Sequence, residues 1–186
     1  MSLSDLFVWM ANTPWSIALK ESLYVWPFVE STHVLALGLF AGTAVMLDLR
    51  LLGLALNRVP ASALTGRLLP WTRAGFAVMA TTGLLLFYAT PVRYYHNVFF
   101  RLKVIVLIVA GINIFVFHSR GHRRVTTWDL DPVAPRAART AAIVSLVAWA
   151  VVVIAGRMIA YNWFDCDIQP QPAFINWAAS CGVGAP

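Results

Sequence analysis

The chain has 186 residues, of which 60% are hydrophobic and only 12% are charged, and eight of them are tryptophan. A single water-soluble core of this size does not need so much apolar surface, so the composition indicates an integral membrane protein without an additional soluble domain. The net charge of +6 does not indicate nucleic-acid binding, because most arginines flank apolar segments instead of forming a basic run among exposed aromatics.

The N-terminal residues 3–20 alternate apolar side chains with Ser, Asp and Asn, and Pro14 interrupts the pattern. The segment is therefore too polar to span a bilayer. It also lacks the basic start, the continuous apolar run and the small-residue cleavage site of a secretory signal peptide. We expect it to stay in the mature protein and to lie at the membrane interface as an amphipathic segment.

Four later stretches are apolar enough to cross a bilayer, which takes about 20 residues per helix. They cover about residues 23–57, 69–90, 99–118 and 137–161. The expected fold class is therefore all-α: one membrane domain, residues 1–186, built as a bundle of four transmembrane helices, with residues 163–186 as a short outer tail.

Basic residues are distributed unevenly between the two ends of this bundle. Those that follow the first or the third span are Arg50, Arg58, Arg67, Arg73, Arg120, Arg123, Arg124, Arg136 and Arg139. Those on the opposite side are Lys20, Arg93, Arg101 and Lys103. Because Lys and Arg favour the cytoplasmic side, we expect a multi-pass protein of the bacterial inner membrane with both termini in the periplasm.

Two cysteines, Cys166 and Cys181, lie in the outer tail. The periplasm is an oxidising compartment, and the spacing allows a bridge that closes the tail. A disulfide between them is expected, with two free thiols as the alternative.

The first span carries two ionisable side chains, Glu30 and His33, in its outer two or three turns. They are three residues apart and share a helix face. An ionisable group at such depth costs about 2.5–3.5 kcal/mol on insertion scales, which points to a functional or a paired group. His33 could bind haem iron, bind copper or another metal, or relay protons; alternatively it is hydrogen-bonded within the bundle, to Glu30 or to a helix carbonyl.

Haem b suits the surroundings of His33 best. A porphyrin needs an apolar slot, one or two axial ligands and cationic groups for its propionates. The small side chains within residues 38–44 could provide the slot, and Arg101, Lys103 and Arg157 could hold the propionates. For Lys103 and Arg157 the alternative is that each extends to the interface without a ligand. Three further polar side chains are expected at a similar depth: Tyr88, His96 and Tyr161.

His96 and Lys103 are the candidate second axial ligands, and five-coordinate iron is the third outcome. His96 lies in the link between the second and third spans and could fold onto the ring, whereas Lys103 would have to bind as a neutral amine. At the inner end, His118 and His122 have the one-turn spacing that lets two imidazoles share a metal, but no third ligand is obvious beyond Asp129 or Asp131. One haem is therefore the upper bound.

Three stretches resemble a family of uncharacterised bacterial four-helix membrane proteins (DUF6644-like) over about residues 20–163. They are His33 with the small residues and DLRLLG that follow it, RLKVIVL at the start of the third span, and SLVAWAVVVIAGRMIAY in the fourth. That family is similar, more distantly, to the copper-resistance D-type membrane proteins and to the haem-binding four-helix protoporphyrinogen oxidase of bacteria. The oxidase resemblance implies haem binding by His33 and a functional role for Lys103.

The leading expectation is a protein that holds one b-type haem near its outer face and works in electron transfer or a membrane-bound redox reaction. Its partners besides the lipid bilayer would be quinone or a periplasmic redox protein, and oxidoreductase activity is left open. The alternatives are a membrane protein that handles copper or another metal, and a cofactor-free accessory subunit that docks a larger complex. A homo- or hetero-oligomer is compatible with each; nucleic acid is not an expected partner.

Overall fold

The computed structural model describes residues 3–120, 128–161, 163–164, 166 and 170–181, apart from the side chains of His118 and Arg120. Every regular element in that part of the chain is a helix. In order they are α1 (Leu3–Ala11), α2 (Pro14–Glu21), α3 (Val25–Leu52), α4 (Ala61–Ala89), α5 (Pro91–Tyr95), α6 (Val98–Arg120), α7 (Arg136–Tyr161) and α8 (Ala173–Ala179). Among the described residues, α3, α4, α6 and α7 contain the four segments long and apolar enough to cross a membrane. The predicted all-α architecture with four helices of spanning length is confirmed.

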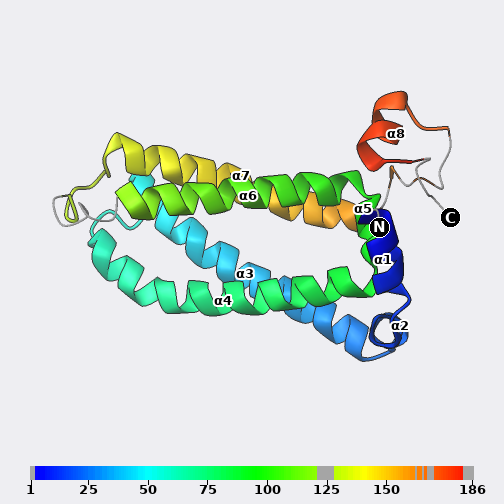
Figure 1. The fold of residues 1–186 in the computed structure, drawn as a ribbon. Coiled ribbons are helices and arrows are strands. Elements are labelled where there is room, and N and C mark those ends of the chain that lie inside the picture. The colour runs from blue at the N-terminus through cyan, green and yellow to red at the C-terminus, as the bar shows by residue number, and fades with distance from the viewer. Residues whose placement is uncertain (1–2, 121–127, 162, 165, 167–169, 182–186) are drawn as a thin grey trace.

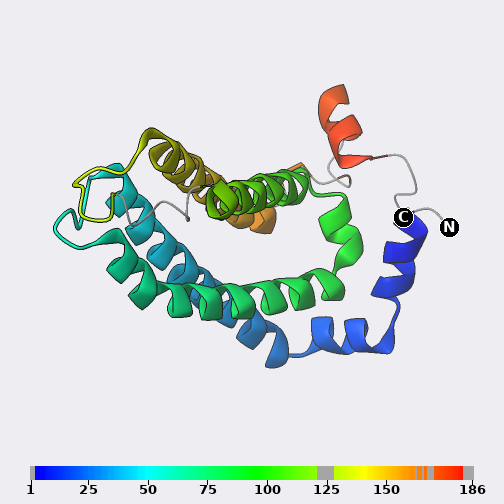
Figure 2. The same ribbon diagram turned by 60° about the vertical axis from the view of Figure 1, so that its left-hand side comes forward.

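The long helices form a bundle that is tightly packed on one side and open on the other (Figures 1 and 2). α3 packs along α4 and against α7, and α6 packs along α7. Where α3, α4 and α7 meet, the Phe40 ring lies 4.5 Å from the Trp149 ring and 5.5 Å from the Phe76 ring, centroid to centroid. A Cβ on Gly75 would lie 3.0 Å from the Phe40 backbone nitrogen, so α4 approaches α3 closely there. α4 and α6 make little direct contact, and Figure 2 shows them apart over much of their length.

Two expected helix boundaries are wrong at the inner end of the bundle. The first span ends at Leu52 and not near residue 57, because Gly53 adopts a left-handed conformation (φ 74°) and its N–H bonds to the carbonyls of the last turn. The second span begins at Ala61 and not near residue 69. Pro70 lies inside this helix, and the segment expected to be a polar connection forms its first turns. The connection between α3 and α4 is consequently short and covers residues 53–60.

The inner end is held together by Arg50, which is 1% exposed. Its Nε donates to the Val59 carbonyl (2.7 Å), and its Nη2 donates to the carbonyls of Asp129 (3.2 Å) and Asp131 (3.1 Å). Arg50 therefore fastens both inner loops to α3. The sequence had suggested a free cation at the interface, but the guanidinium is buried. Asp48, one half-turn earlier, is also buried and is hydrogen-bonded by Ser145 of α7.

The predicted interfacial segment consists of two short helices, α1 and α2, at the outer end of the bundle (Figure 1). Thr13 caps α2, and its hydroxyl lies 2.6 Å from the Tyr88 hydroxyl of α4. Ser16, which is fully buried, donates to the Tyr88 and Ala89 carbonyls at the end of α4. These bonds satisfy carbonyls that a helix end leaves open. They tie the N-terminal segment to the bundle.

The tail lies at the same end of the bundle as α1 (Figure 1). Within it, Cys166 and Cys181 form a disulfide with their Cα atoms 5.3 Å apart. The bridge joins the chain just after α7 to the residue that follows α8.

Candidate functional site

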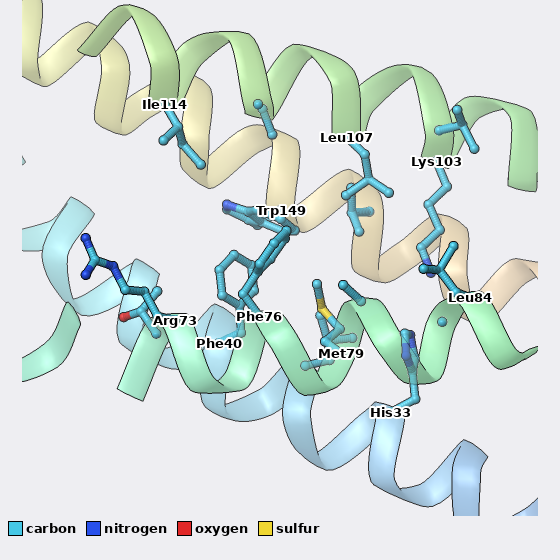
Figure 3. A pocket seen from close by; sticks show the side chains of 18 of the residues that line it. His33, Phe40, Arg73, Phe76, Met79, Leu84, Lys103, Leu107, Ile114 and Trp149 are labelled. Atoms are coloured by element: carbon cyan, nitrogen blue, oxygen red, sulfur yellow. The ribbon is translucent and has the colours of Figure 1, made fainter. Parts of the chain in front are cut away.

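A large apolar cavity lies between α3, α4, α6 and α7, with a volume of about 1100 Å³. Figure 3 shows the side chains that line it. Most are aliphatic or aromatic, including Leu37, Phe40, Phe76, Met79, Leu84, Phe87, Phe100, Leu107, Ile114 and Trp149. The ionisable side chains that border it are His33, Arg73 and Lys103.

His33 reaches the cavity from α3 and is held by Thr82 of α4. The His33 Nδ1 lies 3.0 Å from the Thr82 hydroxyl oxygen. That hydroxyl donates its own proton to backbone carbonyls of α4, at 2.7 Å from Val78 and 3.1 Å from Met79. Its oxygen therefore accepts the Nδ1–H of His33, and the lone pair of the neutral ring is on Nε2. The backbone of Met79 also hydrogen-bonds the imidazole.

Two glycines make room for this end of the cavity. A Cβ on Gly83 of α4 would lie 3.1 Å from Cε1 of His33, so only glycine lets the imidazole stand this close to the helix. A Cβ on Gly156 of α7 would lie 3.4 Å from the Nζ of Lys103. The backbone of α7 consequently forms the wall beside the lysine amine.

Lys103 reaches the same end of the cavity from α6 (Figure 3). It is close enough for its positive charge to act electrostatically on His33. The structure thus brings together the two residues, His33 and Lys103, that the sequence singled out on different spans. Between them the lining is apolar.

Aromatic side chains close the outer end above this pair. The Phe87 and Phe100 rings stack with centroids 5.5 Å apart, joining α4 to α6, and Tyr94 of α5 lies 5.0 Å from Phe100. Burial raises the pKa of Tyr94, so its phenol stays neutral over the physiological range. Three packed rings therefore cover this end of the cavity.

His96 and Arg101 lie outside the cavity, because the tail engages them. His96 Nδ1 donates to the Ala179 carbonyl (3.0 Å). Arg101 donates to the Ala178 carbonyl (2.6 Å) and the Ser180 hydroxyl (3.0 Å), at the C-terminus of α8. A cationic group at a helix C-terminus is electrostatically favourable. In this structure both residues hold α8 in place.

Glu30, Arg157 and Tyr161 are on the exposed surface. Glu30 does not line the cavity and does not bond to His33, so the expected shared site of these two residues is not formed. Arg157 donates to the Tyr161 hydroxyl (3.2 Å) and stacks over its ring, 5.2 Å from the centroid. The pair lies at the outer end of α7, away from the residues that border the cavity.

Arg73 is the cavity residue that the sequence analysis missed, having treated it only as a charge that sets topology. It borders the end of the cavity opposite His33 (Figure 3). The spacing contained the signal: Arg73, Phe76, Ala80, Gly83 and Phe87 recur every three or four residues and share one face of α4. A polar residue on that face of α4 is therefore expected to border the same cavity as the apolar residues.

In the described part of the chain, no three His, Cys, Asp or Glu side chains come together as a metal site. The His118 side chain and all of His122 lie outside the described residues. Asp129, considered as a third ligand, accepts instead from the Ser62 backbone N–H (2.7 Å) and hydroxyl (2.5 Å). These bonds lower the pKa of Asp129. Asp129 therefore acts as a cap at the start of α4.

Comparison with known proteins identifies the family but no activity. No curated protein and no solved structure matches the chain. Residues 19–162 match the model of DUF6644, described as a family of unknown function. Because that match takes in all of α3, α4, α6 and α7, the chain belongs to the DUF6644 family.

Proposed function

We propose that this protein binds one haem b near its outer face and works in electron transfer or a membrane-bound redox reaction. The observation that carries the proposal is the setting of His33. Its Nδ1 donates to the Thr82 hydroxyl, and the ring borders an apolar cavity of about 1100 Å³. A histidine that binds a metal through one nitrogen generally donates a hydrogen bond from the other.

The side chains around His33 fit a porphyrin. The cavity is at the upper end of the range of about 300–1000 Å³ that is usual for small-molecule sites, and its lining is mostly apolar. Gly83 leaves the imidazole space against α4. Among the described residues, His33 is the imidazole that borders the cavity, and a flat apolar ring could lie beside it.

Lys103 is better placed than His96 to act as the second ligand. It borders the cavity near His33, whereas His96 donates to the Ala179 carbonyl in the tail. As a neutral amine Lys103 could bind iron, and as an ammonium group it could hold a propionate. Of the two arginines expected to hold propionates, Arg101 is engaged by α8, which leaves Arg157 beside Tyr161.

Haem b, when bound, would supply a one-electron redox couple. His33 would bind the iron, and Thr82 would fix the orientation of the imidazole. The apolar lining would exclude water, which together with ligation tunes the potential of such sites. Electrons would be exchanged with quinone from the bilayer or with a periplasmic redox partner at the outer end.

The proposed pair, His33 and Lys103, is also the basis of the distant resemblance to the haem-binding protoporphyrinogen oxidase. Oxidation of protoporphyrinogen itself is not part of the proposal. Copper handling, suggested by the resemblance to the copper-resistance D-type proteins, has less support because no group of three metal-binding side chains occurs in the described residues. No observation favours a cofactor-free accessory subunit.

The proposed location is the bacterial inner membrane with both termini in the periplasm. α1 and α8 lie at the same end of the bundle (Figure 1), which agrees with an even number of crossings. Removing the buried Arg50 from the basic residues of the inner side leaves the asymmetry intact. Reporters fused at residues 62 and 127 should read cytoplasmic, and a periplasmic signal from either would overturn this orientation.

The haem proposal is tested by the absorption spectrum of the purified protein and of two histidine variants. His33→Ala should abolish or strongly shift the Soret band, because it removes the iron ligand. His96→Ala is the matched control, since it removes an imidazole from the outer side but not from the cavity. An unchanged spectrum in His33→Ala, or a loss confined to His96→Ala, would contradict the assignment. Lys103→Met then distinguishes a lysine ligand from five-coordinate iron.

A further inference from the structure

The cavity is longer than the site around His33. Its lining on α6 runs from Phe100 to Phe115, and its lining on α4 runs from Leu69 to Phe87. At 1.5 Å per residue the cavity extends about 22 Å along α6, against a hydrocarbon thickness of about 30 Å. His33 and Lys103 border only the outer end (Figure 3). The inner half is therefore available to a second molecule.

This inner half opens sideways, between α4 and α6. The two helices touch at the outer end through the Phe87 and Phe100 rings, but they make little direct contact elsewhere. Side chains that line the cavity are also exposed at the surface: Phe76 is 49% exposed, Leu84 69% and Phe115 72%. The cavity is thus continuous with the apolar surface that would face lipid. A molecule from the bilayer could enter without crossing a polar layer.

Arg73 lies at the inner end of this opening. It is ten residues before Gly83, which contacts His33, so it lies about 15 Å farther inward along α4. In the described part of the chain, Arg73 has no hydrogen bond or ion pair. Trp71 on the same helix is 62% exposed, as expected of an aromatic residue at the membrane interface. An unpaired guanidinium at that depth favours an anionic headgroup.

We propose that the inner half of the cavity binds one anionic phospholipid. Its phosphate is bound by Arg73, and one of its acyl chains lies between α4 and α6 and extends toward Lys103. The apolar groove alone gives little selectivity, because an acyl chain is equally well solvated by the bilayer. The charge of Arg73 therefore decides which lipid is bound. The choice of the cytoplasmic leaflet for this lipid rests on the orientation given under the proposed function. The rest of the inference does not depend on it.

The role of the Arg73 charge in lipid selection is tested by native mass spectrometry. The detergent-purified protein is titrated with phosphatidylglycerol or with phosphatidylcholine of the same acyl chains. The wild type should retain one phosphatidylglycerol in preference to phosphatidylcholine. Arg73→Gln should weaken phosphatidylglycerol binding about fivefold, the factor expected for one basic residue beside an anionic headgroup, and leave phosphatidylcholine unchanged. Arg67→Gln is the matched control, because Arg67 is exposed on the same helix but does not border the cavity.

The groove is tested separately with a pair of glycines. A Cβ on Gly111 or on Gly38 would meet no atom within 4 Å, but only Gly111 borders the cavity. Gly111→Leu should fill the groove and weaken the binding of both lipids, whereas Gly38→Leu should change neither. Thermal unfolding of each variant checks that it is folded.

Equal retention of both lipids by the wild type would overturn the inference, as would unchanged binding in folded Arg73→Gln or Gly111→Leu. Haem content is measured on the same samples and reports on the outer end alone. Lipid selectivity without haem would contradict only the proposed function, and haem without lipid selectivity would contradict only this inference.

Discussion

The inner end of α3 and the cavity beside α4 place similar arginines in different surroundings. Arg50 is almost fully buried and donates to three loop carbonyls. Arg73 is exposed, borders the cavity and has no hydrogen bond or ion pair within the described residues. In the sequence both are basic residues near an apolar span. The comparison teaches that an arginine bound by backbone carbonyls belongs to the fold, whereas an arginine beside apolar space is available to a ligand.

The same contrast recurs at the outer end, only two residues apart. Arg101 donates to the C-terminus of α8, whereas Lys103 faces the cavity and His33. Neighbouring cations on one helix therefore have different roles: one attaches the tail and the other belongs to the candidate site.

The largest expected effect comes from breaking the inner-end junction. Arg50→Ala should destabilise the protein by about 4.5 kcal/mol or more, because hydrogen bonds to a charged group contribute about 1.5–3 kcal/mol each and three are lost. Arg73→Ala should leave stability unchanged to within about 0.5 kcal/mol, as is usual for substitutions without lost contacts. Thermal unfolding in detergent measures both. Equal effects would contradict the distinction between the two arginines.

The next effect concerns the tail that engages Arg101. A disulfide that closes a loop of about 15 residues stabilises by about 3 kcal/mol, and Cys166 and Cys181 are separated by 15 positions. Cys166→Ser, or reduction of the wild type, should therefore make the chain beyond Trp163 more sensitive to protease while the bundle remains folded. Thiol labelling of the native, unreduced protein provides the check. Full labelling of both cysteines would show that the bridge is absent.

A smaller effect compares the packed contact of α4 with α3 and the open cavity wall on α6. Gly75→Ala would place its Cβ 3.0 Å from the Phe40 backbone nitrogen and 3.3 Å from the Ala36 carbonyl oxygen. Such overpacking costs about 1–3 kcal/mol. Gly111→Ala adds a Cβ in open space and should be neutral or slightly stabilising, because alanine favours helix. A larger loss in Gly111→Ala than in Gly75→Ala, measured by thermal unfolding, would mean that the cavity is closed.

The smallest effect is a pH dependence at the inner end. Hydrogen bonds from Ser62 lower the pKa of Asp129 below its ordinary value of about 3.9. The stabilisation is therefore complete above that ordinary value and is lost as the pH falls through the lower folded value. Asp129→Asn should remove this contribution and flatten the stability profile below about pH 4. Parallel profiles in the two proteins would show that the cap contributes nothing.

The helices could be predicted from the sequence because four apolar runs of about 20 residues leave few alternatives. Their inner boundaries could have been placed better. Gly53 follows the last apolar turn of α3, as a C-terminal glycine does. The second span was expected to begin near residue 69, but α4 begins at Ala61 and accommodates Pro70 in its interior.

The candidate site was only partly predictable. His33 and Lys103 could be brought together by depth alone, since each lies in the outer turns of its span. The tail contacts of His96 and Arg101 could not be predicted, because they depend on where α8 folds back. Their acceptors are mostly backbone carbonyls, which every residue has and which the sequence therefore does not distinguish. Arg73 was interpreted only as one of the basic residues that set the membrane topology, because a basic residue beside a span needs no further partner for that role.

The central claim is that the cavity beside His33 holds one haem b, and the most direct test is the haem content of the wild-type protein. The protein is produced in cells supplied with haem, purified in mild detergent, and assayed as the pyridine haemochrome. The account predicts a b-type spectrum with one haem per chain, because in the part of the chain that the structure describes His33 is the only imidazole bordering the cavity. A protein that carries no haem under these conditions, or two haems per chain, would contradict it.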